Sequence, residues 1–123
     1  MLETRIFSDR RCLEHRVPAG FPEVPARLSG VLASVEELGL EELTADDGPP
    51  AGLDEAVAGV HGRAYPERLR RAVERGDGLI DSADNPLSPA TWTAARAAAG
   101  AAVAAAAWAA AGAGRLGFAA VRL

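Results

Sequence analysis

Phe21-Pro22-Glu23-Val24-Pro25-Ala26-Arg27-Leu28 is the segment with the clearest structural signal in this sequence. Two prolines each fix φ and withhold a backbone donor, so they favour an extended lead-in, and the second one fits the first turn of a helix. Apolar residues then recur at helical spacing until Gly39, namely at Leu28, Val31, Leu32, Val35 and Leu38. The pattern predicts a helix over residues 25–38 with one buried face.

Arg27 lies beside this apolar face and not opposite it. A guanidinium in that position either lies along the surface or points into a polar cavity, because burying an unpaired charge costs too much free energy. Arginine is usually exposed, so the residues alone favour the surface.

Further elements follow from periodicity and from chain-breaking residues. Thr4, Ile6 and Phe7 alternate with polar neighbours and predict a short strand that ends near Ser8. Breaker residues predict loops over residues 45–50 and 76–89, and helical patterns predict short helices over 53–60 and from 65 or 66 to 75, with Gly76 as the cap.

The C-terminal third is rich in alanine. Ser88 and Pro89 fit an N-cap followed by a first-turn proline, which predicts a long helix over residues 89–112. Residues 97–114 carry no charge, and this segment is long enough to meet the crude test for a membrane span. Most of its residues are alanine, however, and alanine is nearly neutral in transfer from water to lipid. We therefore expect a helix packed closely on a sheet, followed by a buried strand from residue 118 to 121.

Composition limits the possible functions. A chain of 123 residues forms one domain at most, and its net charge of −4 gives no electrostatic footprint for nucleic acid or an anionic membrane. The single cysteine, Cys12, permits no internal disulfide, and the N-terminus has no apolar secretory segment. We expect a cytoplasmic protein without nucleic-acid or membrane partners.

Local chemistry gives no complete active site. His15 and His61 have no second ligand at metal-binding spacing, so the expected role of each is a hydrogen bond to a nearby backbone group. Cys12 lies three residues before His15, but nothing places a third, orienting group beside this pair. By local chemistry alone, the 123 residues contain no complete metal site and no recognisable catalytic site.

The order of several segments is more informative than any one of them. His15 precedes residues 21–28, and Val60-His61-Gly62-Arg63-Ala64-Tyr65, Asp81-Ser82-Ala83-Asp84-Asn85-Pro86-Leu87-Ser88-Pro89, an Ala/Gly-rich helix and Phe118-Ala119-Ala120-Val121-Arg122 follow in turn. This order closely resembles the N-terminal part of the histone deacetylase family, including its bacterial acetylpolyamine amidohydrolases and acetoin-utilisation proteins. The resemblance covers essentially the whole chain.

The resemblance implies a three-layer α/β fold of the arginase/deacetylase type around a parallel sheet, of which residues 1–123 are the N-terminal portion. In the family, the strand resembling residues 118–121 leads into a Pro-Gly-His-His loop with the catalytic histidines. The zinc ligands and the oxyanion-stabilising tyrosine come later still. The resemblance thus implies a zinc-dependent deacetylase for the parent protein, and an inactive fragment without bound zinc for this chain.

Two residues match family roles. Asp84 resembles the loop aspartate that accepts hydrogen bonds from the substrate at the pocket rim, although an Asx turn before proline also explains it. Arg27 resembles the arginine of the internal cavity that attracts the acetate product, which shifts the expectation for Arg27 toward a buried position. Phe21 departs from the family, which usually has histidine there, and Asn85 often appears as threonine.

The substrate stays open between acetyl-lysine, an acetylated polyamine and another small acylamide. An alternative function is a small Ala-rich helical interaction module that dimerises through the helix between Trp92 and Trp108 and has no enzymatic activity. The codons after Leu123 distinguish the two, as does behaviour in solution. A lone pair of parallel strands predicts aggregation or loose folding, whereas the module predicts a cooperatively melting dimer.

Overall fold

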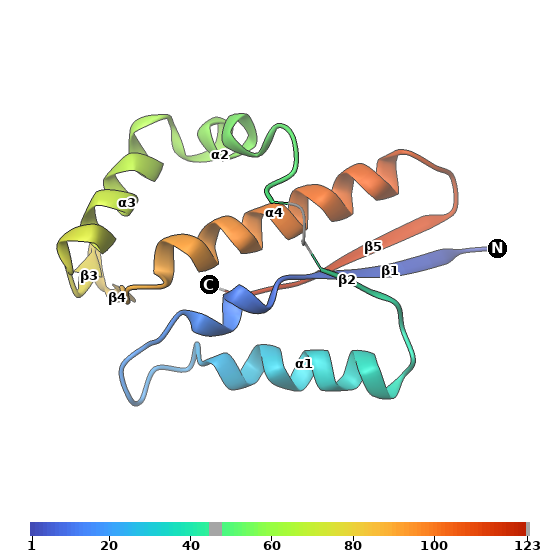
Figure 1. The fold of residues 1–123 in the computed structure, drawn as a ribbon, viewed down its shortest axis with the longest axis horizontal. Helices are drawn as coiled ribbons and strands as arrows, with labels where there is room; N and C mark the ends of the chain where they lie inside the picture. Colours follow the sequence, from blue (N-terminus) through green and yellow to red (C-terminus); the bar gives the residue numbers. More distant parts are fainter. Residues whose placement is uncertain (45–47, 123) are drawn as a thin grey trace.

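A computed structural model describes residues 1–44 and 48–122 of the chain, so residues 45–47 of the expected 45–50 loop lie outside the described residues. The elements follow the chain from N- to C-terminus in Figure 1. They are β1 (Glu3–Ser8), a short 3-10 helix η1 (Arg10–Glu14), α1 (Pro25–Glu37), β2 (Glu42–Thr44), α2 (Leu53–His61), α3 (Ala64–Arg75), β3 (Leu79–Ile80), β4 (Ser82–Pro86), α4 (Thr91–Ala110) and β5 (Arg115–Ala120).

The main sheet has three parallel strands in the order β2-β1-β5. The first strand of the chain is therefore the central one, and Glu3 pairs with Arg115 while Ser8 pairs with Ala120. The predicted first strand is confirmed. The strand expected over residues 118–121 is β5, which spans Arg115–Ala120, and it is not buried as expected, because Leu116 and Phe118 are 49% and 54% exposed. The expectation of a lone strand pair is wrong, because the three-residue β2 was too short and too acidic to show a strand pattern.

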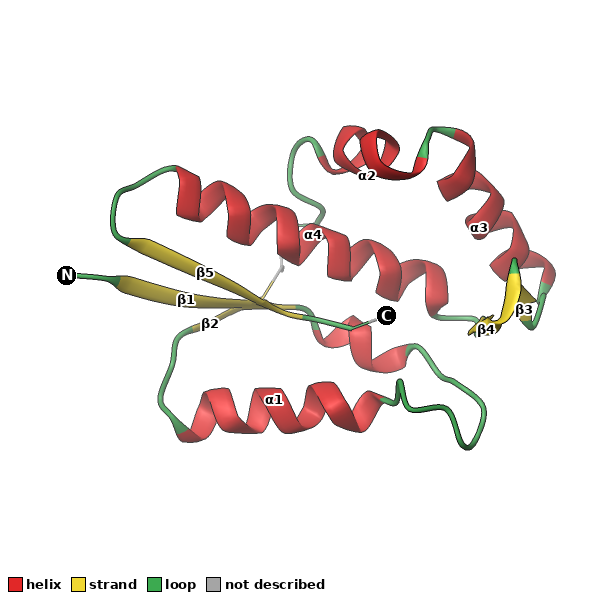
Figure 2. Ribbon diagram, turned by 180° about the vertical axis from the view of Figure 1, so that it is seen from behind, coloured by secondary structure: helices red, strands yellow, loops and turns green. Residues whose placement is uncertain are grey.

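Helices cover both faces of this sheet, with α1 on one side and α4 on the other (Figure 2). The arrangement confirms the expected layered α/β class with a parallel sheet. Ile6 and Phe7 alternate between the two faces: Ile6 packs in a cluster with Leu28 and Leu32 of α1, and Phe7 packs in a cluster with Ala101 of α4.

The predicted helix over residues 25–38 is confirmed to within one residue, but only part of its apolar face is covered. Leu28, Leu32 and Val35 are buried, whereas Val31 is 41% exposed and Leu38 is 72% exposed. Val31 lines a surface depression together with Phe118 of β5, which is itself 54% exposed. The apolar surface of α1 and β5 thus extends beyond the part that the two elements bury together.

Small side chains bring α4 close to the sheet, as the alanine-rich sequence predicted. A Cβ atom built on Gly117 of β5 would lie 2.8 Å from the carbonyl oxygen of Ala105, so only glycine permits this approach. The helix begins at Thr91 with Ala90 as its N-cap residue, so the expected start at Pro89 with a Ser88 cap is wrong by two residues. Among the described residues, none of the helices has the length and apolar character that crossing a bilayer requires.

The predicted short helices are confirmed as α2 and α3, and Gly76 ends α3 in the left-handed conformation. The expected loop over residues 76–89 is partly wrong, because it contains the antiparallel hairpin β3–β4. Asp81 forms its turn at φ 63°, and Arg68 of α3 binds the Asp81 carboxylate at 2.6 Å. The polar sequence of β4, which contains proline, gave no strand signal, since none of the residues of β4 is buried and β3 has only two residues, of which Ile80 is buried.

Candidate functional site

Arg122 lies at the C-terminal end of β5 and is the best-connected charged residue of the described chain. Its side chain is 4% exposed and forms a two-nitrogen ion pair with the Glu23 carboxylate, at 2.9 Å from Nε and 2.5 Å from Nη2. Nη1 also donates to the backbone carbonyls of Cys12 and His15, at 2.7 and 2.8 Å. One guanidinium thus joins η1, the loop after it and the lead-in to α1 to the end of the central sheet.

His15 continues this network toward α4. It is buried, and its Nδ1 lies 2.8 Å from the hydroxyl oxygen of Thr91. That hydroxyl accepts a hydrogen bond from the Ser88 amide at 2.7 Å, and the Arg16 amide donates to the Ser88 hydroxyl at 3.1 Å. Both the loop after η1 and the start of α4 are therefore held by hydrogen bonds. The expectation that His15 bonds a nearby backbone group is wrong, because the partner of its ring nitrogen is a side chain 76 residues further along the chain.

Burial determines the protonation of two groups here. Burial in apolar surroundings, together with the nearby Arg122 cation, lowers the pKa of His15 below its ordinary 6.5, although Glu23 opposes this effect. Burial also raises the pKa of the Cys12 thiol, whose sulfur lies 3.7 Å from the Ala94 carbonyl oxygen. A buried, protonated thiol is a poor nucleophile, so the structure gives no support to a Cys12–His15 catalytic pair.

We expect the free energy of unfolding to fall as the pH drops from about 7 to about 5. The pKa of His15 is lower in the native state than in the unfolded chain, so the unfolded chain takes up the proton first as the pH falls. The contribution of neutral His15 to stability is therefore complete above pH 6.5 and is lost progressively below it. Asp9, Glu67 and Asp81 also have lowered pKa values, but they start from 3.8 or 4.5 and act at lower pH. Urea unfolding at several pH values measures the slope, and His15→Asn should flatten it; an equal slope in both proteins would contradict the assignment.

A cavity of about 400 Å³ opens between α3, the β3–β4 hairpin and the start of α4. Its polar lining residues come from five separate segments, and they are His15, His61, Tyr65, Asp84, Asn85 and Thr91. The rings of His61 and Tyr65 stack with centroids 5.3 Å apart. Leu69, Ile80 and Ala95 supply apolar surface. The fold thus brings the two histidines and the predicted substrate-binding aspartate to the walls of one cavity.

Asp84 lies on β4 and is exposed. Its backbone amide and the side-chain amide of Asn85 both donate to the Ser82 hydroxyl, at 3.3 and 3.4 Å, so Ser82 and not Asp84 supplies the oxygen that holds this turn, and the Asx turn considered for Asp84 is not observed. No hydrogen bond or ion pair joins the Asp84 carboxylate to another described residue. The neighbouring Asp81, by contrast, is bound by Arg68. The carboxylate of Asp84 is therefore an acceptor that is free to bind a ligand.

Arg27 lies elsewhere, on the α1 side of the sheet. It is exposed and lines a depression of about 310 Å³ with Glu23, Phe118 and Arg122. The surface position favoured by the residues alone describes this chain, and the buried position implied by the resemblance is not observed in it. Sequence reasoning missed the role of Arg122. This residue was part of the quoted motif over residues 118–122, but no function was assigned to it.

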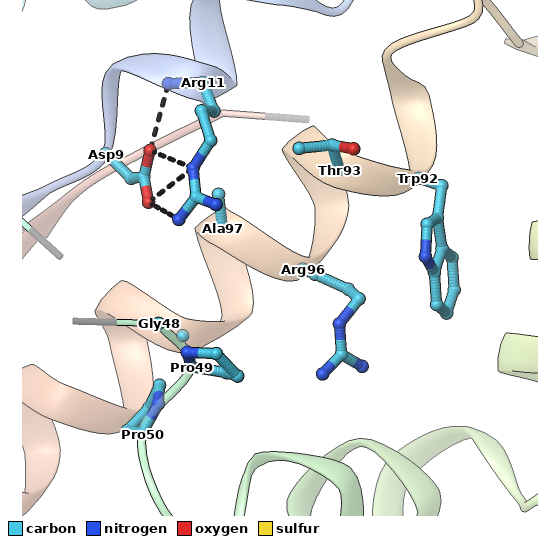
Figure 3. Close-up of a pocket in the computed structure, with 10 residues that line it drawn as sticks. Asp9, Arg11, Gly48, Pro49, Pro50, Trp92, Thr93, Arg96 and Ala97 are labelled. Atoms are coloured by element: carbon cyan, nitrogen blue, oxygen red, sulfur yellow. Dashed lines mark hydrogen bonds and ion pairs between the residues drawn. The ribbon is translucent and has the colours of Figure 1, made fainter. Parts of the chain in front are cut away.

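A third cavity, of about 220 Å³, lies between η1 and α4 (Figure 3). The Asp9 carboxylate binds the amide and the guanidinium of Arg11, as the dashed lines show, and these hydrogen bonds lower the pKa of Asp9. Arg96, on the other wall, binds Asp54 at 2.8 Å and lies over the Trp92 ring. Both cations are paired with carboxylates, so this cavity offers no free positive charge to an anion.

The residues present do not fit a metal ion. In the part of the chain that the structure describes, no three His, Cys, Asp or Glu side chains are grouped so that they could hold one. We therefore derive no metal-dependent step for this chain.

The parallel sheet and the helices on both its faces define a layered α/β domain. The histone deacetylase domain model matches residues 21–122. Because this match covers most of the 123 residues, the chain belongs to the histone deacetylase family. The observed fold is consistent with part of the arginase/deacetylase fold. No curated protein matches the sequence.

Proposed function

We propose that residues 1–123 are the N-terminal portion of a single histone deacetylase-like domain, of the bacterial type, whose catalytic His-His loop lies outside this chain. The parent enzyme is proposed to be a cytoplasmic, zinc-dependent amidohydrolase that removes acetyl groups from acetyl-lysine or acetylated polyamines. The observation that carries the proposal is the family match over residues 21–122. The chain by itself is proposed to bind no catalytic zinc and to be inactive.

In this proposal Asp84 is a substrate-binding residue. Asp84 lines a cavity of about 400 Å³, and its carboxylate has no partner among the described residues, so it can accept a hydrogen bond from an N–H group of the substrate. The hairpin that carries it is fixed by the Arg68–Asp81 ion pair at its turn.

Arg27 is proposed to belong to the product cavity of the parent protein. The depression that it lines already contains the second arginine, Arg122, but that cation is occupied by Glu23. No ion pair joins Arg27 to another described residue, so its guanidinium is available to attract acetate.

The alternative of a dimerising helical module receives no support from α4. Its small residues Ala94, Ala97, Ala101 and Ala105 are buried within the chain itself, and Trp108 packs against Phe7 with ring centroids 5.9 Å apart. The helix face that dimerisation would use is thus already covered by the sheet.

Two measurements test the proposed function. We expect the purified chain to hold no stoichiometric zinc after dialysis and to hydrolyse neither N-acetylputrescine nor an acetyl-lysine peptide in the presence of added zinc. We also expect the nucleotides after codon 123 in the source DNA to encode Pro-Gly-His-His or a close variant. Turnover with tightly bound zinc in the chain would contradict the fragment proposal, and an immediate stop codon would contradict the longer parent protein.

A further inference from the structure

His15 has one ring nitrogen that its hydrogen-bond network does not use. Nδ1 contacts Thr91, but Nε2 makes no hydrogen bond to a described residue. Among the described residues, Nε of Arg5 is the one completely buried side-chain nitrogen or oxygen without a hydrogen-bond partner. Nε2 of His15 also has no such partner, so this atom is not completely buried. His15 is 4% exposed overall and lines the cavity that contains Asp84, so the cavity is where this accessibility arises.

The orientation of this imidazole is fixed before any ligand arrives. Thr91 holds Nδ1, and Arg122 holds the His15 carbonyl oxygen at 2.8 Å. Burial and the Arg122 cation favour the neutral ring, because they lower its pKa. A neutral imidazole in a fixed orientation presents one hydrogen-bonding nitrogen to the cavity at neutral pH.

The remaining lining determines which ligands fit. No arginine lines the cavity, and Asp84 contributes a carboxylate without a partner. An anion would therefore meet a negative charge and no compensating cation, whereas an N–H group meets an acceptor. The apolar surface of Leu69, Ile80 and Ala95 suits a short aliphatic segment.

We infer that His15 Nε2 and the Asp84 carboxylate contact the same ligand in this cavity, and that this ligand is an uncharged or cationic amide or amine with a short aliphatic chain. The inference deepens the proposed function, on which it rests for the substrate role of Asp84, and adds a residue to that site for which sequence reasoning gave no binding role. Its test requires no turnover.

The test measures binding of N-acetylputrescine to the whole chain by following the imidazole resonances of His15 at neutral pH. We expect these resonances to shift in a saturable way with N-acetylputrescine and not with acetate. All proteins in this test carry the substitution Phe118→Lys. Phe118 is an exposed apolar residue on the α1 face of the sheet, and replacing it by a charged residue limits association between copies of the chain. Unmoved His15 resonances, or an equal response to acetate, would overturn the inference.

Two substitutions at position 15 separate binding from structural support. The asparagine amide reaches about as far as Nδ1, so His15→Asn keeps a polar group near Thr91 but leaves the cavity without Nε2; we expect about a tenfold loss of affinity. The glutamine amide reaches about as far as Nε2, so His15→Gln should recover most of the binding. His15→Asn that folds and binds like the parent would overturn the assignment.

Asp84→Asn should also lower the affinity by about tenfold, and Glu37→Gln on the exposed side of α1 is its matched control. If His15→Asn does not fold, the resonance shifts of unsubstituted His15 and the Asp84→Asn affinity decide the question. If N-acetylputrescine binds and the gene stops at codon 123, the binding supports this site, whereas the stop codon contradicts the proposed parent enzyme. A confirmed His-His loop with no probe binding would contradict this inference alone.

Discussion

Arg122→Met should lower the free energy of unfolding by about 2–3 kcal/mol, because Arg122 is 4% exposed but its partner Glu23 is 32% exposed, which keeps the cost below that of breaking a fully buried ion pair. The substitution leaves the Glu23 carboxylate without its cation and the carbonyl oxygens of Cys12 and His15 without their donor. Urea unfolding followed by tryptophan fluorescence measures the loss. Arg122→Lys should recover only part of the lost free energy of unfolding. A lysine ammonium cannot bind the Glu23 carboxylate and both carbonyl oxygens at once, as the planar guanidinium with its several N–H donors does.

A double-mutant cycle distinguishes lost pairing from lost packing. We expect Arg122→Met combined with Glu23→Gln to cost clearly less than the sum of the two single substitutions, because the double variant leaves no uncompensated carboxylate. Arg75→Met is the matched control, since Arg75 is exposed and pairs only with the nearby Asp77. A cycle that is additive within error would show that Arg122 acts through its aliphatic stem and not through Glu23.

Gly117→Val should be the most damaging small-residue substitution in the sheet. Even the Cβ of alanine would lie 2.8 Å from the carbonyl oxygen of Ala105 and 3.4 Å from its Cβ, and the contacting atom is helix backbone that cannot rotate away. We expect Gly117→Ala to cost about 1–3 kcal/mol and the valine variant more, because α4 must move away from β5. Thermal unfolding of the two variants gives the order.

Gly30→Ala provides a control of opposite sign. Gly30 lies within α1, and a Cβ atom there would meet nothing within 4 Å. Alanine in a helix interior is favoured over glycine by about 0.5–1 kcal/mol, so this variant should be more stable than the parent. Equal effects at positions 30 and 117 would show that the close helix–sheet approach does not limit stability.

The elements that sequence reasoning found share a local signal. Residues 25–38 carry both a helical period and a proline at the start, and Gly76 marks the end of α3 in the left-handed conformation that glycine prefers. The elements it missed depend on contacts between distant residues: β2 consists of three residues that pair with β1, and the β3–β4 hairpin turns at Asp81, which Arg68 binds. A short strand held by distant partners leaves no period in its own sequence.

The site shows the same division. Asp84 could be proposed from the sequence because a family motif marks its position. The position of His15 on a wall of the same cavity could not, since it depends on Thr91, 76 residues further along the chain. Arg122 was hidden for a similar reason, as its partner Glu23 lies 99 residues away. Charged residues look alike in a sequence until the fold shows which of them are buried.

The position of β1 in the middle of the sheet has a consequence for biosynthesis. The ribosome makes β1, the central strand, first. Its neighbour β5 and Arg122, whose guanidinium binds Glu23, are made only after almost all of the preceding residues. Until then, the backbone N–H and C=O groups of β1 that pair with β5 in the native sheet have no partner strand. Nascent chains should therefore need protection by chaperones until residues 115–122 have left the ribosome, and the pairing of β1 with β5 should form only after that point.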